Sequence, residues 1–497
     1  MIQRACLASL LIAAVAACGK SEPKGSATSG GSAPGPGTGQ ADVPRPPPPP
    51  PQPLPPLAAD PGGATGVVAR AVALGGPATD TIRAVAVAGD GAVVTGFFEG
   101  DAMLTPYQVT SAGRSDAFVA RLGKDGAVAW VATLGGPNDD TGNAVAVSPD
   151  GTIAFGGLFS KTVAFGATQG TAVGSDDLYV AAVGADGTPR WLWTAGGLDS
   201  DELTALVATP DGGFVAALSW GGKVDFGITT AVARGYDDAG LVKLSATGQV
   251  EWFTPVQGDG SEAIKRLAVD RNGTIYALGG FQQTLDLGGG PLTSAGAMDL
   301  LIARFDASGR HVWSKRVGNP WNEVAGGIAV DRAGGLVITG SFDRDVDFLG
   351  TPLVAGGESD VFVARLTGDG ALAWVKRFGA TREDIGYGVG VDDAGHAVVV
   401  GFFQSPIDFG GGLRKSKGQK DGFVARFDVE GKHLWSTRFG DWDDDYATSV
   451  AVAPDGTAWV AGLFRYQLDL ISPPLTATPS GEPKVGKSDA FVARFER

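Results

Sequence analysis

Seven acidic residues recur at an almost constant spacing along the chain. They are Asp80, Asp140, Asp201, Glu262, Glu323, Asp384 and Asp445. Carboxylates gathered by a repeating fold could attract a cation or a basic partner, and a pair of them could act as the acid and base of a glycosidase. They could equally cap turns or pair with a repeated arginine, and we favour this structural interpretation. The seven are our candidate binding residues, and we predict no catalytic residue.

Two acid-rich segments have the composition of calcium loops. The first contains Asp343, Asp345 and Asp347, and the second covers residues 441–445. Neither continues into the Asp-x-Asp-x-Asp-Gly pattern with a distant glutamate that a compact calcium loop uses. Asp347 also occupies a repeated position, which indicates a structural role. We therefore predict no metal site and no cofactor, with calcium as the one metal left open.

Other catalytic motifs are weak. The chain has three histidines: His311 and His433 hold the same position in different repeats, and His396 falls in a turn. We find no nucleophile elbow and no zinc-ligand spacing. Residues 481–488 formally match a phosphate-binding loop, but they lead into a strand-like segment, whereas that loop needs a helix after it. An enzyme stays an open alternative, because paired carboxylates need no motif.

The elements that must position these residues belong to a repeat. Tryptophans recur every 61 residues, at Trp130, Trp191, Trp252, Trp313, Trp374 and Trp435. A fixed period of this length is typical of a repeat architecture. Each repeat contains four short apolar runs joined in pairs by Asp-Gly turns, which favour hairpins. The runs are apolar at odd and even positions alike, so we expect both faces of each sheet to be buried.

Counting the runs predicts how the repeat array ends. The third run of each unit begins with an aspartate, at Asp116, Asp177, Asp238, Asp299, Asp360, Asp421 and Asp489. The seventh unit stops at Arg497 without a fourth run, whereas Val67–Leu74 is a single run without a unit. Pairing the two closes a ring and removes an exposed strand edge. We predict an all-β fold over residues 67–497: a seven-bladed β-propeller of four-stranded antiparallel blades, closed by an N-terminal strand.

The repeat also resembles a known family. Its elements are A-V-A-V, D-G, V-D-F-G, D-A-F-V-A-R and D-G-x-x-x-W. They are similar to the seven-bladed β-propeller (SBBP-type) repeats of bacterial surface and secreted proteins. The resemblance covers most of the chain after residue 66. It implies the propeller fold and leaves the ligand open.

The N-terminus predicts export and a lipid anchor. Residues 1–17 combine one early positive charge, Arg4, with an apolar run that is too short to span a bilayer, as in a secretory signal. The following residues, Val15-Ala-Ala-Cys18-Gly19, resemble the lipobox of bacterial lipoproteins, which implies lipidation of Cys18. Gly19 by the same resemblance favours the outer membrane. Residues 18–66 are rich in Gly, Ser and Pro, so we expect a disordered tether.

The net charge and the lengths of the connections limit which partners and which binding face we expect. The chain carries a net charge of −15, which disfavours nucleic acid as a partner. We expect a monomeric lipoprotein of the cell envelope whose propeller is a non-catalytic binding or scaffold module for a protein or polysaccharide. The alternative is a propeller glycan hydrolase or lyase that uses the repeated carboxylates at the channel mouth. Because long connections vary most, we expect ligands on the face that carries them.

Overall fold

The computed structural model describes residues 66–477 and 488–497, which belong to the compact unit Asp60–Arg497. This part of the chain is built from β-strands, and none of its residues forms a helix long and apolar enough to cross a membrane. The predicted signal peptide, Cys18 and nearly all of the predicted tether lie outside the described residues, as does most of the segment 481–488.

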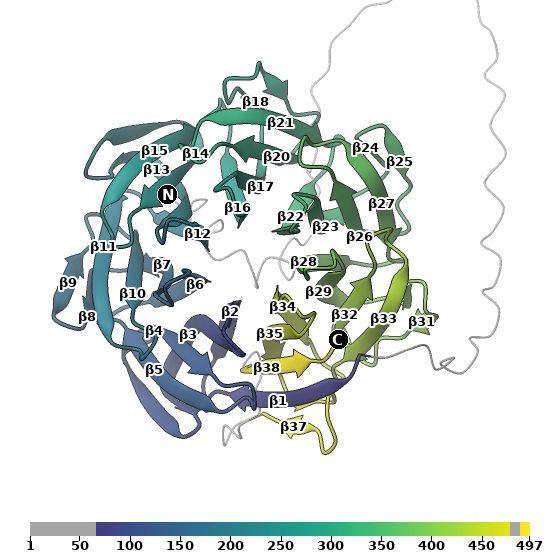
Figure 1. Ribbon diagram of the computed structural model, residues 1–497, viewed down its shortest axis with the longest axis horizontal. Coiled ribbons are helices and arrows are strands. Elements are labelled where there is room, and N and C mark those ends of the chain that lie inside the picture. Colours follow the sequence, from purple (N-terminus) through teal and green to yellow (C-terminus); the bar gives the residue numbers. More distant parts are fainter. Residues whose placement is uncertain (1–65, 478–487) are drawn as a thin grey trace, which may run out of the picture. The chain divides into compact units, whose positions relative to one another are not determined.

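Four-stranded antiparallel sheets repeat along the chain. Five are separate, and an eight-stranded sheet contains two more groups of four, joined where β11 pairs with β13, so the described part holds seven such groups. Figure 1 shows them arranged radially, with the first strand of each group nearest the centre. We number these groups sheets 1 to 7 by the order of their first strands.

The strands of the first three sheets are as follows. Sheet 1 comprises β2 (Asp80–Ala88), β3 (Gly91–Leu104), β4 (Tyr107–Leu122) and β5 (Val128–Leu134). Sheet 2 comprises β6 (Asp140–Val147), β7 (Ile153–Phe159), β10 (Asp177–Val183) and β11 (Pro189–Gly197). Sheet 3 comprises β12 (Asp201–Ala208), β13 (Phe214–Asp225), β14 (Thr230–Leu244) and β15 (Val250–Val256).

The next three sheets follow the same order. Sheet 4 comprises β16 (Glu262–Val269), β17 (Ile275–Phe281), β20 (Asp299–Phe305) and β21 (His311–Val317). Sheet 5 comprises β22 (Glu323–Val330), β23 (Leu336–Phe342), β26 (Asp360–Leu366) and β27 (Leu372–Phe378). Sheet 6 comprises β28 (Asp384–Val391), β29 (Ala397–Phe403), β32 (Asp421–Phe427) and β33 (His433–Phe439).

Sheet 7 combines the two ends of the described chain. It comprises β34 (Tyr446–Val452), β35 (Ala458–Phe464), β38 (Asp489–Phe495) and β1 (Val68–Leu74). β1 lies antiparallel to β38, with Val72 opposite Val492 and Leu74 opposite Ala490. The strand that the sequence left without a unit therefore pairs with the last strand, as predicted.

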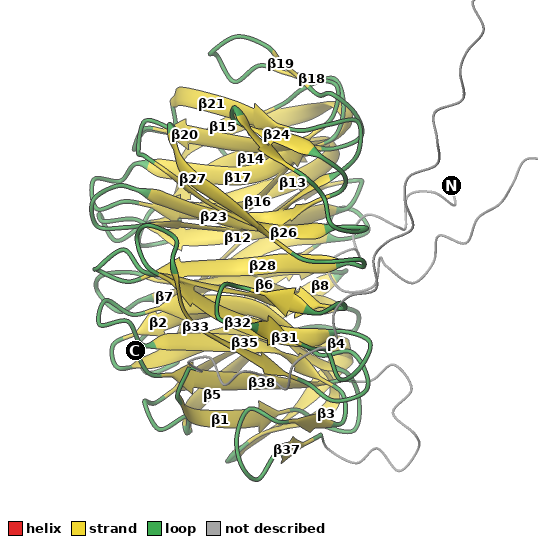
Figure 2. Cartoon of the chain, turned by 90° about the vertical axis from the view of Figure 1, so that its right-hand side faces the viewer, coloured by secondary structure: helices red, strands yellow, loops and turns green. Residues whose placement is uncertain are grey.

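Short hairpins extend the connections between second and third strands. They are β8 (Thr162–Phe165) with β9 (Thr168–Thr171), β18 (Thr284–Leu285) with β19 (Leu292–Thr293), β24 (Val346–Phe348) with β25 (Thr351–Leu353), β30 (Ile407–Asp408) with β31 (Leu413–Arg414), and β36 (Gln467–Leu468) with β37 (Leu475–Thr476). We call the face that carries these connections the long-connection face. The opposite face carries the turns between first and second and between third and fourth strands, and we call it the tight-turn face; the C-terminus lies there (Figure 2).

The recurring tryptophan joins four of the outer strands to the next sheet through a hydrogen bond. Trp374 Nε1 donates a hydrogen bond to the Val429 carbonyl of sheet 6 at 3.0 Å, and the same bond recurs from Trp130, Trp191 and Trp313. Gly431 in that turn has φ +77°, and a Cβ there would lie 2.9 Å from the Trp374 ring. Glycine is therefore required both by the backbone conformation and by the close ring.

The hydrophobic core lies between neighbouring sheets. One buried cluster, for example, combines Val93 and Val119 of sheet 1 with Phe155 and Tyr179 of sheet 2. A sheet that is covered on both faces needs apolar residues at odd and even positions, which explains the continuous apolar runs in the sequence. The prediction of an all-β repeat fold is confirmed.

Candidate functional site

The seven recurring acids begin the innermost strands or directly precede them, and they are buried. Their exposure is between 0 and 3%. Each carboxylate accepts a hydrogen bond from the backbone N–H four residues earlier, at 2.5 to 3.2 Å. The donors, in the order of the acids, are Gly76, Gly136, Gly197, Gly258, Asn319, Ala380 and Asp441. Through these bonds the acids cap turns, which is the structural interpretation that we favoured from the sequence.

Each of these acids has a second carboxylate beside it, from the third strand of the preceding sheet. The pairs are Asp116 and Asp140, Asp177 and Asp201, Asp238 and Glu262, Asp299 and Glu323, Asp360 and Asp384, Asp421 and Asp445, and Asp489 and Asp80. The backbone also bridges the sheets here, since the Asp201 N–H donates to the Asp176 carbonyl at 2.8 Å. We call each such pair an inter-sheet acid pair.

Burial changes the protonation of these pairs. It is the largest cause of a raised pKa in all seven first-strand acids, and the carboxylate of the neighbouring sheet raises the pKa further. The pKa rises to about 6 for Asp384, to about 7 for Asp80, Asp140 and Glu262, and to about 8 for Asp201, Glu323 and Asp445. At neutral pH the acids with a pKa of about 7 or 8 are therefore partly or mostly protonated, whereas Asp384 is mostly ionised.

A repeated arginine is also present, but it pairs with the other acid. Arg316 and Arg438 lie 2.7 Å from the third-strand acids Asp299 and Asp421. A ligand-binding role for the seven first-strand acids stays a prediction, and their burial disfavours it. The alternative of a glycan hydrolase loses its candidate acids for the same reason, because a carboxylate enclosed in a turn does not reach a polysaccharide.

The segments that resembled calcium loops stabilise their own backbone. Asp345 accepts a hydrogen bond from the Ala355 N–H at 2.9 Å, and Asp347 accepts one from Gly350 at 2.7 Å. Asp441 accepts bonds from the Asp443 and Gln467 N–H groups. In residues 66–477 and 488–497, no group of three His, Cys, Asp or Glu side chains is arranged to hold a metal ion.

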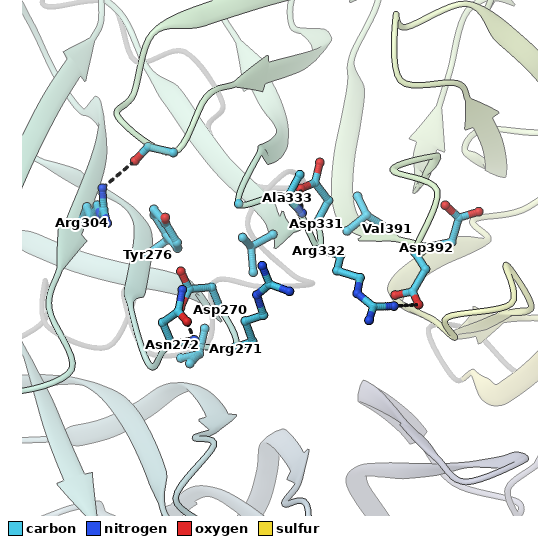
Figure 3. Close-up of a pocket in the computed structure, with 15 residues that line it drawn as sticks. Asp270, Arg271, Asn272, Tyr276, Arg304, Asp331, Arg332, Ala333, Val391 and Asp392 are labelled. Carbon is cyan, nitrogen blue, oxygen red and sulfur yellow. Dashed lines mark hydrogen bonds and ion pairs between the residues drawn. The ribbon is translucent and has the colours of Figure 1, made fainter.

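A cavity of about 650 Å³ opens on the tight-turn face of sheets 4, 5 and 6. It is lined by the turns between first and second strands, 270–272, 331–334 and 392–393, and by Tyr276, Arg304 and Gly368. Figure 3 shows Arg271 and Arg332 in its middle, with Asp270 and Tyr276 on one side and Asp392 on the other. This is the face opposite to the one on which the sequence led us to expect a ligand.

Two of the three sheets share a contact that holds the turns together. In sheet 6, Arg426 lies 2.5 Å from Asp392 in the turn of its own sheet and donates to the Gly456 carbonyl in the next turn at 2.8 Å. In sheet 5, Arg365 contacts Asp331 and Gly395 in the same way. We call this contact the arginine bridge.

Sheet 4 has the residues of an arginine bridge but does not form one. Its arginine, Arg304, donates instead to the Gly368 carbonyl at 3.0 Å. The cause is its cross-strand neighbour: Arg304 pairs with Tyr276, whereas Arg365 pairs with Val337. The tyrosine ring lies under the guanidinium group, 5.7 Å from it. The space that an arginine bridge would fill therefore stays open as part of the cavity.

The sequence contained a signal for this site that we did not use. Tyr276 stands at a position that is valine in sheets 5 and 6 (Val337 and Val398), and a large polar residue at an apolar repeat position is a local departure from the pattern. The turn position of Arg271 is also irregular: it holds arginine in sheets 4 and 5, whereas sheets 2, 3 and 7 have proline there. Departures from a repeat, rather than its constant residues, indicated the cavity.

Comparisons with known proteins show distant similarity. No family model matches the chain. The regulatory protein FlaEY of Caulobacter vibrioides is 27% identical over 162 residues, which is 32% of this chain and 16% of that protein. Sqt1 from Chaetomium thermophilum is 11% identical with a TM-score of 0.41, covering 86% of this chain and 98% of that one. Puromycin hydrolase is 14% identical with a TM-score of 0.40, covering 78% and 51%. Values this low carry no argument about function.

Proposed function

We propose that residues 67–497 form a closed seven-bladed β-propeller of the SBBP-type repeat family. The seven groups of four strands and the pairing of β1 with β38 support this proposal. So do the tryptophan contacts between successive sheets. With no free strand edge at either end of the array, such a ring gains stability without a disulfide, and the chain after residue 18 has no cysteine.

The cellular location that we propose is the bacterial cell envelope. Cys18 would carry the lipid, the outer membrane is favoured by Gly19, and residues 18–66 would form the tether. Several acyl chains make a lasting anchor, at about 0.8 kcal/mol for each buried CH₂ group. Labelling of the expressed chain with a palmitate analogue tests the proposed lipidation. The Cys18→Ala variant should not be labelled.

The activity that we propose is ligand binding without catalysis, with the tight-turn-face cavity as the binding site. The observation that carries this proposal is the missing arginine bridge of sheet 4. Without the bridge, a space lined by polar groups stays open above Tyr276. Loops and turns on a rigid scaffold are common places for recognition. The ligand would be a polysaccharide or a protein segment with polar groups.

A cavity-filling variant tests this proposal. Tyr276→Val restores the residue of the neighbouring sheets, so we expect Arg304 to reach Asp270 and the Gly334 carbonyl and to close the cavity. Binding is measured by calorimetry with the full chain against defined polysaccharides and acidic and neutral peptides. Tyr236→Val serves as the control, because Tyr236 is 73% exposed on the long-connection face.

The proposal predicts that Tyr276→Val loses at least tenfold in affinity while Tyr236→Val retains the affinity of the parent chain. Equal affinity of all three proteins would place the ligand elsewhere. Tyr276 is 1% exposed, so the variant should melt at a somewhat lower temperature; a cooperative transition well above the assay temperature shows that the loss of affinity reflects the cavity and not unfolding.

A further inference from the structure

The residues at one turn position explain the charge of the cavity. The second residue of the turn between first and second strands is Arg271 in sheet 4, Arg332 in sheet 5 and Asp393 in sheet 6. Arg332 lies 3.1 Å from Asp393, so an arginine here pairs with the residue at the same position one sheet further on. For Arg271 that residue is Arg332, which has the same charge. The one aspartate at this turn position pairs with Arg332, which leaves Arg271 without a partner of this kind.

Two further acids of the cavity are already paired. Asp331 is paired with Arg365, and Asp392 is paired with Arg426. Among the described residues, Arg271 and Arg304 form no ion pair. The lining residues without an ion-pair partner are thus two guanidinium groups, Arg271 and Arg304, and one carboxylate, Asp270.

Arg304 has unused hydrogen-bonding capacity at this site. Its Nη1 donates to the Gly368 carbonyl, while its buried Nε has no hydrogen-bond partner. A buried donor without a partner costs free energy, because water no longer satisfies it. A guanidinium group presents its donors in a planar fork that matches two oxygens of a carboxylate or phosphate. A bound oxyanion would accept hydrogen bonds from the guanidinium groups of Arg271 and Arg304 that line the cavity, and it would separate Arg271 from Arg332.

We propose that the tight-turn-face cavity binds an oxyanion, a carboxylate or phosphate group, through Arg271 and Arg304. This inference rests on the proposed function and assigns the chemical class of its ligand. The site is a local cationic one on a protein with a net charge of −15, so it selects for a ligand that places its anionic group in the cavity.

Calorimetric titration of the full chain with inorganic phosphate and, separately, with malonate tests the inference. We expect at least one of the two probes to bind, and the stronger one identifies the class of oxyanion. Arg271→Gln should weaken its binding about tenfold or more, as expected for the loss of a charge-assisted hydrogen bond. Arg332→Gln is the matched control, because Arg332 holds the same turn position but is neutralised by Asp393.

A variant with increased affinity provides a second test of the inference. Asp393→Asn releases Arg332 from its ion pair, so the affinity for the oxyanion should rise severalfold. Absence of binding by both probes, or equal losses in Arg271→Gln and Arg332→Gln, would overturn the inference. If Tyr276→Val abolishes binding of a neutral ligand while phosphate and malonate do not bind, the proposed function stands and the oxyanion assignment fails.

Discussion

The inter-sheet acid pairs make the stability of the fold depend on pH, and Asp201→Asn tests this directly. Burial, backbone hydrogen bonding and the neighbouring Asp177 leave the pKa of Asp201 at about 8, against 3.8 for a free carboxyl. The folded state therefore binds a proton that the unfolded state releases between pH 4 and pH 8. Stability due to this group is fully present below about pH 4, is lost as pH rises to about 8, and is constant above that.

The magnitude follows from the size of the pKa shift. Each pKa unit corresponds to about 1.4 kcal/mol, so from pH 5 to pH 9 the parent chain should lose up to about 4 kcal/mol through Asp201 alone. The asparagine side chain of the Asp201→Asn variant would keep an oxygen for the Gly197 N–H, which Asp201 accepts at 2.6 Å, and it cannot ionise. At pH 5 the variant should thus be no more stable than the parent. At pH 9 the difference in free energy of unfolding should shift in favour of the variant.

Urea unfolding at pH 5 and pH 9 measures this difference, and titrating groups that do not interact with Asp201 cancel in the comparison. The control is Asp225→Asn in the same sheet, since Asp225 is exposed and accepts the Gly227 N–H at 2.9 Å. The control should show the same difference from the parent at both pH values. If Asp201→Asn also shows no change in its difference from the parent, the buried pair does not hold the proton and the reasoning is wrong.

Two further predictions concern the ring itself. Trp374→Ala should lower the free energy of unfolding by about 3 kcal/mol, through lost apolar burial and the lost hydrogen bond to Val429; chemical denaturation measures this loss, and Trp321→Ala, 53% exposed, should cost far less. A chain that begins at residue 76 lacks β1 and exposes the edge of β38, so it should melt at a lower temperature and aggregate in size-exclusion chromatography. A chain that begins at residue 66 keeps β1 and should behave like the parent, and equal behaviour of the two truncations would contradict the pairing.

The repeat pattern predicted the sheets because it reports on contacts that every repeat makes. Trp374 and Gly431 recur since each outer strand contacts the next turn, and this regularity is visible in the sequence. Turn capping by the repeated acids was also expected from the sequence, and its hydrogen bonds are present, but the pairing of these acids across sheets was not predicted. Asp177 and Asp201 lie 24 positions apart, in different sheets, and the close approach depends on how neighbouring sheets pack.

The cavity could not be predicted from the constant residues, because it arises where one side chain redirects another. Asp270 and Arg304 match the residues of an arginine bridge, so the pattern alone favours a bridge in sheet 4 as in sheets 5 and 6. The cross-strand contact with Tyr276 decides otherwise, and only the paired strands β17 and β20 place the two residues side by side. A sequence pattern states which residue types recur, whereas the structure states which of them compete for the same space.

The path of β1 bears on which ligands could reach the cavity. β38 begins at Asp489 on the long-connection face and ends at Phe495 on the tight-turn face, and Val68 lies opposite Phe495. The described chain therefore enters sheet 7 on the tight-turn face, the face that holds the cavity. Any anchor that precedes residue 66 is therefore attached to sheet 7 on the face that holds the cavity. Small probes are the ones least affected by a chain attached on this face, which makes the phosphate and malonate titrations the sharpest first experiment.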